Sequence, residues 1–424
     1  MSARLAAELA RAVAGPVRRP ADPGFSAELA GFQLGLRHRP DVVVGALDAA
    51  DVRAALRIAG DHAIPVTVHG TGHGMRSAAD GGIVLGLRRL NEVEIDPVAG
   101  TARLGGGATW AEVIAATAPH GLLPPSGSAA GVGAAGYVFG GGLGLLARSD
   151  GWACDHVRSF TVATLDGTER EVGPDDTERF ARLRGTGPVH GEVVTAMTVG
   201  LLPGGPLQGG GLTFDLGPAT AGGDPAVLQA YREWTDALPD DLTSALRVMS
   251  FPDLDVLPLP LRGRRIARIA VASRGTAPAA ERLVAPLRDA APVIEDTLAP
   301  LRFTESARVH AEPADPGAYI GENLLLGRLD PAALDALAEL SGPTMVIMNI
   351  RHLGAALARP PAVPDTVRGR DAHYLVSAVS PVDPRVSLAD PAAAHAQASP
   401  VWALEPFAAA RLGTSPAFTA GPRG

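Results

Sequence analysis

Short apolar runs rich in branched residues alternate with amphipathic stretches along the first two hundred residues. Asp41 to Gly45 (DVVVG) has the pattern of a buried strand, and residues 52–63 repeat apolar side chains at helical spacing. Pro65 ends that helix, and residues 66–68 form the next strand. This order predicts a β-α-β unit with a parallel strand pair and a right-handed crossover, after a helix and an irregular lead-in over residues 1–37.

The same alternation continues to about residue 200. Thr109 and Glu112 have the spacing of a capping box, which predicts a helix from Trp110 that closes at His120-Gly121. Strands are predicted at 82–87, 93–96, 101–104, 157–165 and 170–172, the second and third as a hairpin around Pro97-Val98-Ala99-Gly100, and residues 191–198 end the first domain.

The pattern of strand-like and helix-like runs changes after a glycine- and proline-rich stretch, Pro203 to Gly211, which we interpret as a junction. We therefore expect two domains, residues 1–203 and residues 204–424, in a chain of the α+β class. The second domain is predicted to be mixed α+β, with a sheet that covers a cofactor. Its predicted strands are 242–249, 265–273, 345–349 and 373–379, and its predicted helices are 225–237, 278–290 and 328–340.

Composition narrows the classes of function. The chain has 424 residues and a net charge of −8, and its 37 basic residues are all arginine. Because it has no basic face with interleaved aromatic residues, nucleic acid is not an expected partner. No apolar run has membrane-spanning length and the N-terminus lacks a signal-peptide core, so we expect a cytoplasmic protein and no membrane partner. One cysteine, Cys154, excludes an internal disulfide, and we interpret it as a small core residue.

Two glycine-rich loops, each fed by a strand, are the strongest candidates for a binding site. The first is His69 to Gly74 (HGTGHG), and the second is residues 126–133, which lead into Gly140 to Gly144 (GGGLG). Glycine permits positive φ and lets backbone N–H groups approach a ligand, so the two loops together predict one long phosphate-bearing cofactor held from two sides. A metal site at His69 and His73 is not expected, because i, i+4 ligands need a helix that the glycines disfavour.

These motifs occur in a recognisable order. The series GTGH, GGGATWAEV and VGAAGYVFGGGLGLLARSDGWACDHV resembles the FAD-binding domain of the vanillyl-alcohol oxidase/p-cresol methylhydroxylase superfamily, in its berberine-bridge-enzyme-like branch, over residues 36–203. The resemblance implies a two-part p-cresol-methylhydroxylase-type FAD-binding domain. It also implies FAD as cofactor, with His73 as the residue that bonds covalently to the flavin in many members. The residues implied to hold FAD are His69, Gly70, Thr71, Gly72, His73, Gly74, Met75, Gly127, Ser128, Ala129, Gly131, Val132, Gly133, Gly136, Gly140, Gly141, Gly142, Gly144, His190 and Val194.

The sequence departs from the family pattern in three places. Ala129 stands where relatives tend to place a second flavin-linking cysteine, so two covalent links are excluded. Pro188, Val189 and His190 alter a segment that usually lies along the cofactor. The family's tyrosine-containing strand and its "YDP-N-F" segment have no counterpart in the ending FAAARLGTSPAFTAGPRG.

The resemblance implies hydride transfer from a substrate alcohol or C–H to flavin N5, with O2 or another electron acceptor. Tyr374 is our candidate pocket residue or base, against ordinary packing in a strand. Asn349 and Arg351 share one face of a strand, where Arg351 binds an anionic substrate, steadies the reduced flavin, or forms a surface ion pair. We expect an oxidase or dehydrogenase of secondary metabolism, in natural product biosynthesis, acting on a small organic molecule. The alternatives are a redox-neutral cyclase or isomerase and a non-catalytic remnant.

Overall fold

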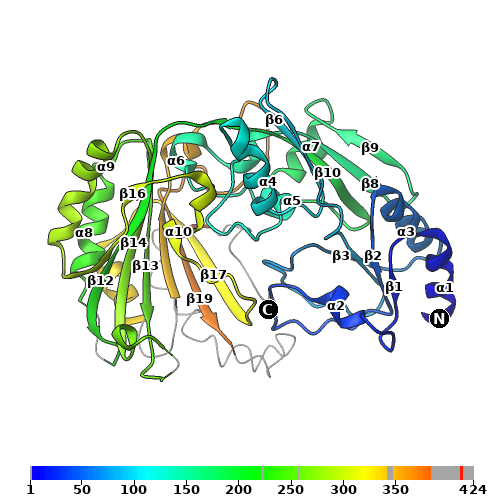
Figure 1. The fold of residues 1–424 in the computed structure, drawn as a ribbon, viewed down its shortest axis with the longest axis horizontal. Coiled ribbons are helices and arrows are strands. Elements are labelled where there is room, and N and C mark those ends of the chain that lie inside the picture. Colours follow the sequence, from blue (N-terminus) through cyan, green and yellow to red (C-terminus); the bar gives the residue numbers. More distant parts are fainter. Residues whose placement is uncertain (1, 221–223, 256, 341–346, 383–410, 414–424) are drawn as a thin grey trace.

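A computed structural model describes residues 2–220, 224–255, 257–340, 347–382 and 411–413. The N-terminal half carries two larger sheets and a two-stranded one, and the C-terminal half carries one large sheet. Helices α4, α5 and α10 lie in the middle of the molecule (Figure 1). None of the helices in these ranges combines the length and the apolar character needed to cross a bilayer.

The first sheet has four strands in the order β1-β2-β4-β3. Its strands β2 and β3 are parallel to β4, which lies between them, so the expected direct pair of β2 with β3 is wrong. The burial explains this arrangement, because β4 is buried along its whole length whereas β3 is only partly buried and suits the edge. The elements are α1 (Ser2–Ala12), β1 (Val17–Arg18), α2 (Phe25–Leu29), β2 (Val42–Gly45), α3 (Ala49–Asp61), β3 (Val66–His69) and β4 (Ile83–Gly86).

The second sheet has five antiparallel strands in the order β5-β6-β10-β8-β9. The predicted capping box is present, since the Thr109 side chain and the Glu112 carboxylate each accept from the other residue's backbone N–H. The elements are β5 (Val93–Asp96), β6 (Thr101–Gly105), α4 (Trp110–Thr117), β7 (Leu122–Leu123), α5 (Ala134–Phe139), α6 (Ala147–Asp150), β8 (Val157–Thr164), β9 (Glu169–Val172), α7 (Thr177–Leu183), β10 (Glu192–Gly200) and β11 (Leu202–Pro203), which pairs with β7.

The C-terminal sheet is antiparallel throughout its described pairs, in the order β15-β12-β14-β13-β18-β19-β17-β20, with β16 beside β12. Helices α8 and α9 cover its outer face in Figure 1. The elements are β12 (Leu207–Pro218), α8 (Ala226–Thr235), β13 (Leu242–Ser250), β14 (Arg264–Arg274), α9 (Ala277–Val284), β15 (Val293–Asp296), β16 (Ala299–Pro300), α10 (Ala307–His310), β17 (Tyr319–Leu326), α11 (Pro331–Leu340), β18 (Ile347–His352), β19 (Tyr374–Pro381) and β20 (Arg411–Gly413). Of the strand predicted at 345–349, residues 345 and 346 lie outside the described residues.

The predicted junction is shorter than expected, because β12 begins at Leu207 and includes Gly209 to Gly211. These glycines are required by packing rather than by a flexible connection. A Cβ on Gly209 would come within 2.7 Å of the Leu301 side chain, and one on Gly211 within 2.9 Å of the Arg268 guanidinium. Glycine in this strand therefore marks close approach of neighbouring segments.

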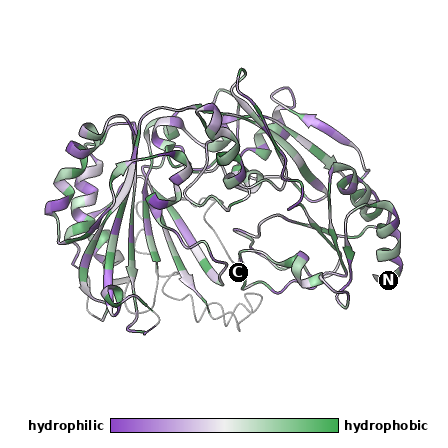
Figure 2. Cartoon of the chain, in the orientation of Figure 1, coloured by the Kyte–Doolittle hydropathy of each residue, from purple (hydrophilic) through white to green (hydrophobic). Residues whose placement is uncertain are grey.

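Alternation divides the C-terminal sheet into two faces with different roles. Leu246, Val248 and Ile350 lie in the apolar core beneath the helices, and helix α8 adds Leu228 and Tyr231 to it. The helices α8 and α9 carry both hydrophobic and hydrophilic stretches, as amphipathic covering helices do (Figure 2). The opposite face of the sheet is left for the residues that meet the N-terminal half.

Candidate functional site

The first glycine loop follows β3 directly and turns through two residues with positive φ, Gly72 (77°) and Gly74 (67°). A Cβ at Gly72 would lie only 2.9 Å from the Cα of Gly31, so the loop passes close to that backbone. The Phe32 N–H donates to the Thr71 carbonyl at 2.9 Å. The loop is thus fixed from one side by residues 31 and 32.

His73 projects from this loop in a defined orientation. Its ring stacks on Phe32, with centroids 3.9 Å apart and an interplanar angle of 18°, and its Nδ1 is 2.9 Å from the Thr71 hydroxyl. Burial lowers the pKa of His73 to about 4, against a smaller opposing effect of Glu312. The imidazole is therefore neutral near pH 7, which leaves a nitrogen lone pair for bonding.

The second loop faces the first. Its rear is held by the start of α4, where Trp110 N–H donates to the Val132 carbonyl (3.0 Å) and Ala111 N–H to the Ala130 carbonyl (2.7 Å). A Cβ on Gly131 would lie 3.9 Å from His73 Cε1. The structure therefore brings together the two loops that were predicted to share a cofactor.

The space between the loops fits a long, polar cofactor such as FAD. A Cβ added at Gly70, Gly74 or Gly136 would meet no described atom within 4 Å, so the chain leaves room beside these backbones. Within the described part of the chain, the buried hydroxyls of Ser126 and Tyr137 have no hydrogen-bond partner. Buried polar atoms without partners are rare in folded proteins, and a bound polar group would satisfy them.

Two of the glycines at 140–144 pack closely against neighbouring side chains. A Cβ on Gly141 would lie 3.0 Å from Trp152, and one on Gly142 would lie 2.5 Å from the Tyr137 ring. Both also have positive φ, 93° and 76°. The conformation of this segment is therefore explained by its own side-chain neighbours.

Four further residues of the predicted set differ in burial and packing. His69, the first residue of the first loop, is 2% exposed, and burial together with neighbouring His38 lowers its pKa to about 4, so its side chain is neutral near pH 7. His190 is exposed, and Val194 is buried in β10 within the apolar core. Met75 packs against the core of the C-terminal half.

The sheet face opposite α8 and α9 carries a polar row directed toward the N-terminal half. Arg247 of β13 donates through Nε to Asn349 Oδ1 of β18 at 2.9 Å, and the two residues are register partners. Ser377 and Asn323 continue the row on β19 and β17. Two of the three predicted catalytic residues, Asn349 and Arg351, lie on this face.

Glu312, which follows α10, connects this row to the second loop. Its carboxylate accepts from the Ser128 hydroxyl at 2.8 Å and from Arg247 Nη2 at 2.9 Å, and Arg351 Nη2 lies 3.4 Å away. Burial opposes its charge, but attraction to Arg351 and Arg247 outweighs this and lowers the Glu312 pKa to about 2. The sequence analysis missed Glu312, because a single acid in a loop has no spacing that marks it.

Tyr374 does not fit the role predicted for it. It belongs to the core beneath α8, where its hydroxyl is 2.8 Å from the Thr235 hydroxyl and its ring stacks on His352 with centroids 5.4 Å apart. Burial raises its pKa. Strand alternation places Tyr374 on the face of the sheet away from the two loops. Its environment is therefore that of ordinary packing in a strand rather than that of a pocket residue.

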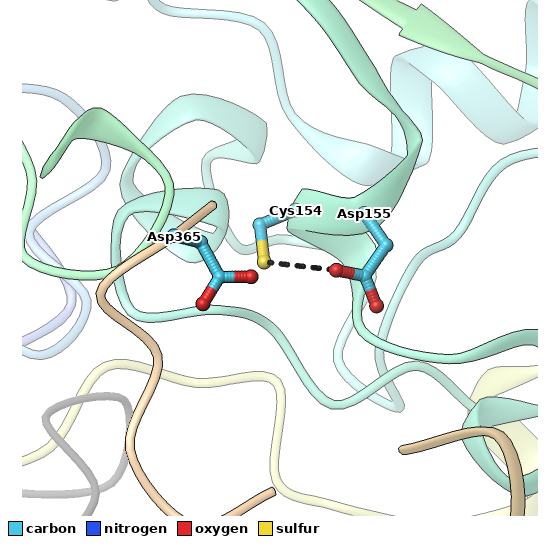
Figure 3. Close-up of side chains that lie close together, drawn as sticks. All are labelled: Cys154, Asp155 and Asp365. Carbon is cyan, nitrogen blue, oxygen red and sulfur yellow. Dashed lines mark hydrogen bonds between the residues drawn. The ribbon is translucent and has the colours of Figure 1, made fainter. Parts of the chain in front are cut away.

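Cys154, Asp155 and Asp365 form a compact group whose possible ligand atoms lie within 4.8 Å of one another (Figure 3). Arg370 already binds both carboxylates, with Nη2 2.5 Å from Asp155 Oδ1 and a second ion pair to Asp365. Cys154 is fully buried, as expected of a core residue, and burial raises the pKa of its thiol. The guanidinium supplies the charge that the acids need, so the group is an internal ion-pair cluster.

Comparison with known proteins identifies the N-terminal half. Residues 40–173 match the family described as "FAD binding domain". The chain is 36% identical over 206 residues to (R)-6-hydroxynicotine oxidase of Paenarthrobacter nicotinovorans, a match that covers 47% of this chain and 44% of that protein. The N-terminal half is thus similar to FAD-binding domains, and FAD is its cofactor. The alignments span about half the length of the curated relatives, or less.

The fold of the whole chain is also shared with solved structures. A berberine-bridge-enzyme-like protein of Physcomitrella patens superposes with a TM-score of 0.81 at 16% identity, over 98% of this chain and 91% of that one. Glucooligosaccharide oxidase from Acremonium strictum, which carries a 6-S-cysteinyl, 8α-N1-histidyl FAD, gives a TM-score of 0.75 at 18% identity, over 89% of this chain and 82% of that one. At these identities the likeness establishes the fold, and it confirms the α+β class.

Proposed function

We propose that this chain is an FAD-dependent oxidoreductase that oxidises a small organic molecule, with FAD held between the two glycine loops. The observation that carries the proposal is the meeting of three parts at one place. Glu312 joins Ser128 of the second loop to the polar sheet row there, and its charge also acts on His73 of the first loop. A cofactor between the loops would be covered by this face of the sheet.

FAD supplies the acceptor for a hydride from an alcohol or C–H of the substrate, and electrons then pass to O2 or another acceptor. The chain's own residues supply the remaining functions. Neutral His73 is suited to a single covalent attachment, and Ala129 offers no thiol for a second one. Asn349 and Arg351 donate hydrogen bonds from the sheet to polar groups of the substrate and orient it.

A redox-neutral reaction, such as a cyclisation or isomerisation, is the second candidate function. It is favoured by the absence of an evident general base among the residues discussed above. Tyr374 lies on the other face of the sheet, and the Glu312 carboxylate is stabilised as an anion beside Arg247 and Arg351. An ion-paired carboxylate with a low pKa is a weak proton acceptor.

An absorbance spectrum, followed by acid precipitation, tests the proposal. We expect flavin to remain with the precipitated protein, and to be released to the supernatant in His73→Ala. The purified protein is then mixed anaerobically with candidate alcohols and cyclic amines, starting with 6-hydroxynicotine because a relative is named for it. Bleaching of the flavin supports oxidation, product formation without bleaching supports the redox-neutral alternative, and a protein that binds no FAD contradicts both.

A further inference from the structure

Glu312 is the point where the cofactor loops and the substrate sheet are joined by hydrogen bonds and charge. It accepts from one loop residue, Ser128, and from Arg247 of the sheet, with Arg351 beside it. Ser128 is 9% exposed and Arg247 is 9% exposed, so these contacts are largely shielded from water. Shielded charge-assisted hydrogen bonds are stronger than those at a surface.

The part of the second loop that is not bonded to α4 is held by the contact between Ser128 and Glu312. Its rear is fixed by the α4 backbone through the Ala130 and Val132 carbonyls, which precede the glycine turn into α5. Residues 127–129 lie on the other side of those bonds, and the Ser128 hydroxyl is their described side-chain anchor. The backbone groups that would approach FAD are therefore held in place from the sheet.

We propose that Glu312 is a positioning residue that holds the second glycine loop in its FAD-binding conformation. Arg247 and Arg351 keep the Glu312 carboxylate charged and oriented toward the second loop, and the carboxylate holds the Ser128 hydroxyl by a hydrogen bond. Binding of FAD between the loops is thereby coupled to the intact substrate sheet. This inference rests on the proposed FAD site, but it assigns a role to residues of the C-terminal half in binding the cofactor itself.

A purely structural role for Glu312 makes a different prediction. In that case Glu312 only stabilises the C-terminal half through its arginines, and Ser128 affects FAD independently. The two roles are separated by a double-mutant cycle, because coupled residues give non-additive losses whereas independent residues give additive ones. Ser128→Ala removes the loop contact and leaves the arginine pairs intact.

The experiment measures FAD affinity in the full-length chain. All variants carry His73→Ala so that FAD exchanges reversibly, and flavin fluorescence gives the dissociation constant. We expect Ser128→Ala and Glu312→Gln each to weaken FAD binding about tenfold, as loss of a hydrogen bond to a charged group would. The double variant is expected to be about tenfold weaker as well, rather than about a hundredfold.

Glu295→Gln is the matched control, because Glu295 pairs with Arg268 of the same sheet at 2.8 Å and accepts from the Thr213 hydroxyl of that sheet. It is expected to change FAD affinity less than twofold. Unchanged affinity in Glu312→Gln, or additive losses in the double variant, would overturn the role of Glu312. If Glu312→Gln does not fold, parent-like FAD affinity in Ser128→Ala still contradicts the inference. A His73→Ala parent and a wild-type chain that both bind no FAD would instead contradict the proposed function.

Discussion

The imidazole of His73 lies flat against the phenyl ring of Phe32, 3.9 Å between centroids, although the two residues come from different segments that meet only in the fold. The stack fixes one face of the imidazole, and the Thr71 hydroxyl fixes one edge at Nδ1. A side chain that must present a nitrogen to a flavin benefits from both restraints.

Replacement of Phe32 tests this restraint. Phe32→Ala is expected to slow covalent incorporation of FAD about threefold to tenfold, because an aromatic stack contributes roughly 0.5–1.5 kcal/mol. The rate is followed as flavin fluorescence of the protein band after denaturing electrophoresis. Phe32→Tyr keeps the ring and should retain the parent rate, and an unaffected Phe32→Ala variant would show that the stack does not orient His73.

Gly70 provides a test of the space reserved for the cofactor. Gly70→Ala is expected to leave the thermal unfolding temperature of the FAD-free protein within about 2 °C, because the added Cβ meets nothing within 4 Å. FAD affinity should fall at least tenfold, because that space is then partly filled. Gly173→Ala, which adds a methyl at an ordinary 3.9 Å contact beyond β9, is the control for both measurements. Unchanged FAD affinity in Gly70→Ala would contradict the placement of the cofactor beside this backbone.

Buried histidines predict how stability depends on pH. Burial lowers the pKa of His69 to about 4, and of His310 and His352 to about 3, against 6.5 for the ordinary side chain. Between about pH 3 and 6.5 the unfolded chain therefore binds more protons than the folded one, so stability is lost as pH falls through this window.

The expected slope is up to about 1.4 kcal/mol per pH unit for each of these histidines. Urea denaturation of the purified protein at pH 7.5, 6.0 and 5.0 measures it. His310→Gln should reduce the slope, whereas His120→Gln, at an exposed residue, should not. A stability that is flat from pH 7.5 to 5.0 would contradict the neutral, buried state of these side chains.

Arg370 is predicted to contribute more to the stability of the fold than an exposed arginine with a similar ion pair. Arg370→Ala leaves Asp155 and the almost fully buried Asp365 without their cation, so we expect a loss of about 2–4 kcal/mol in the free energy of unfolding. Arg302→Ala removes an ion pair to Glu305 from an arginine whose side chain is 82% exposed, and should cost less than about 1 kcal/mol. Equal losses of unfolding free energy for the two variants in chemical denaturation would contradict a larger stabilising contribution from the Arg370 ion pairs.

Local sequence patterns predicted most of the N-terminal elements, because those patterns act over a few residues. The capping box at Thr109 and the hairpin around residues 97–100 are both present. Strand order depends instead on which strand is buried most completely. Periodicity alone does not show which of several apolar strands that is, so the placement of β4 between β2 and β3 was not predicted.

The candidate site shows the same division. Glycine spacing located the two loops that face each other, whereas it did not distinguish glycines beside open space, such as Gly70, from Gly142, which packs against Tyr137. Strand alternation placed Asn349 and Arg351 on one face of their strand, but it did not predict which face meets the N-terminal half. Glu312 was not predicted, because its role arises from contacts with residues up to 184 positions away.

The chain crosses between its halves more than once, which bears on how the protein is made. Arg184 donates to the Val363 and Pro364 carbonyls and Arg370 binds Asp155, so contacts of 179 to 215 residues in separation complete the N-terminal half. During synthesis these groups emerge long before their partners. Contacts so distant in sequence slow folding, and Arg184 and Asp155 gain these partners only after residue 370 has left the ribosome.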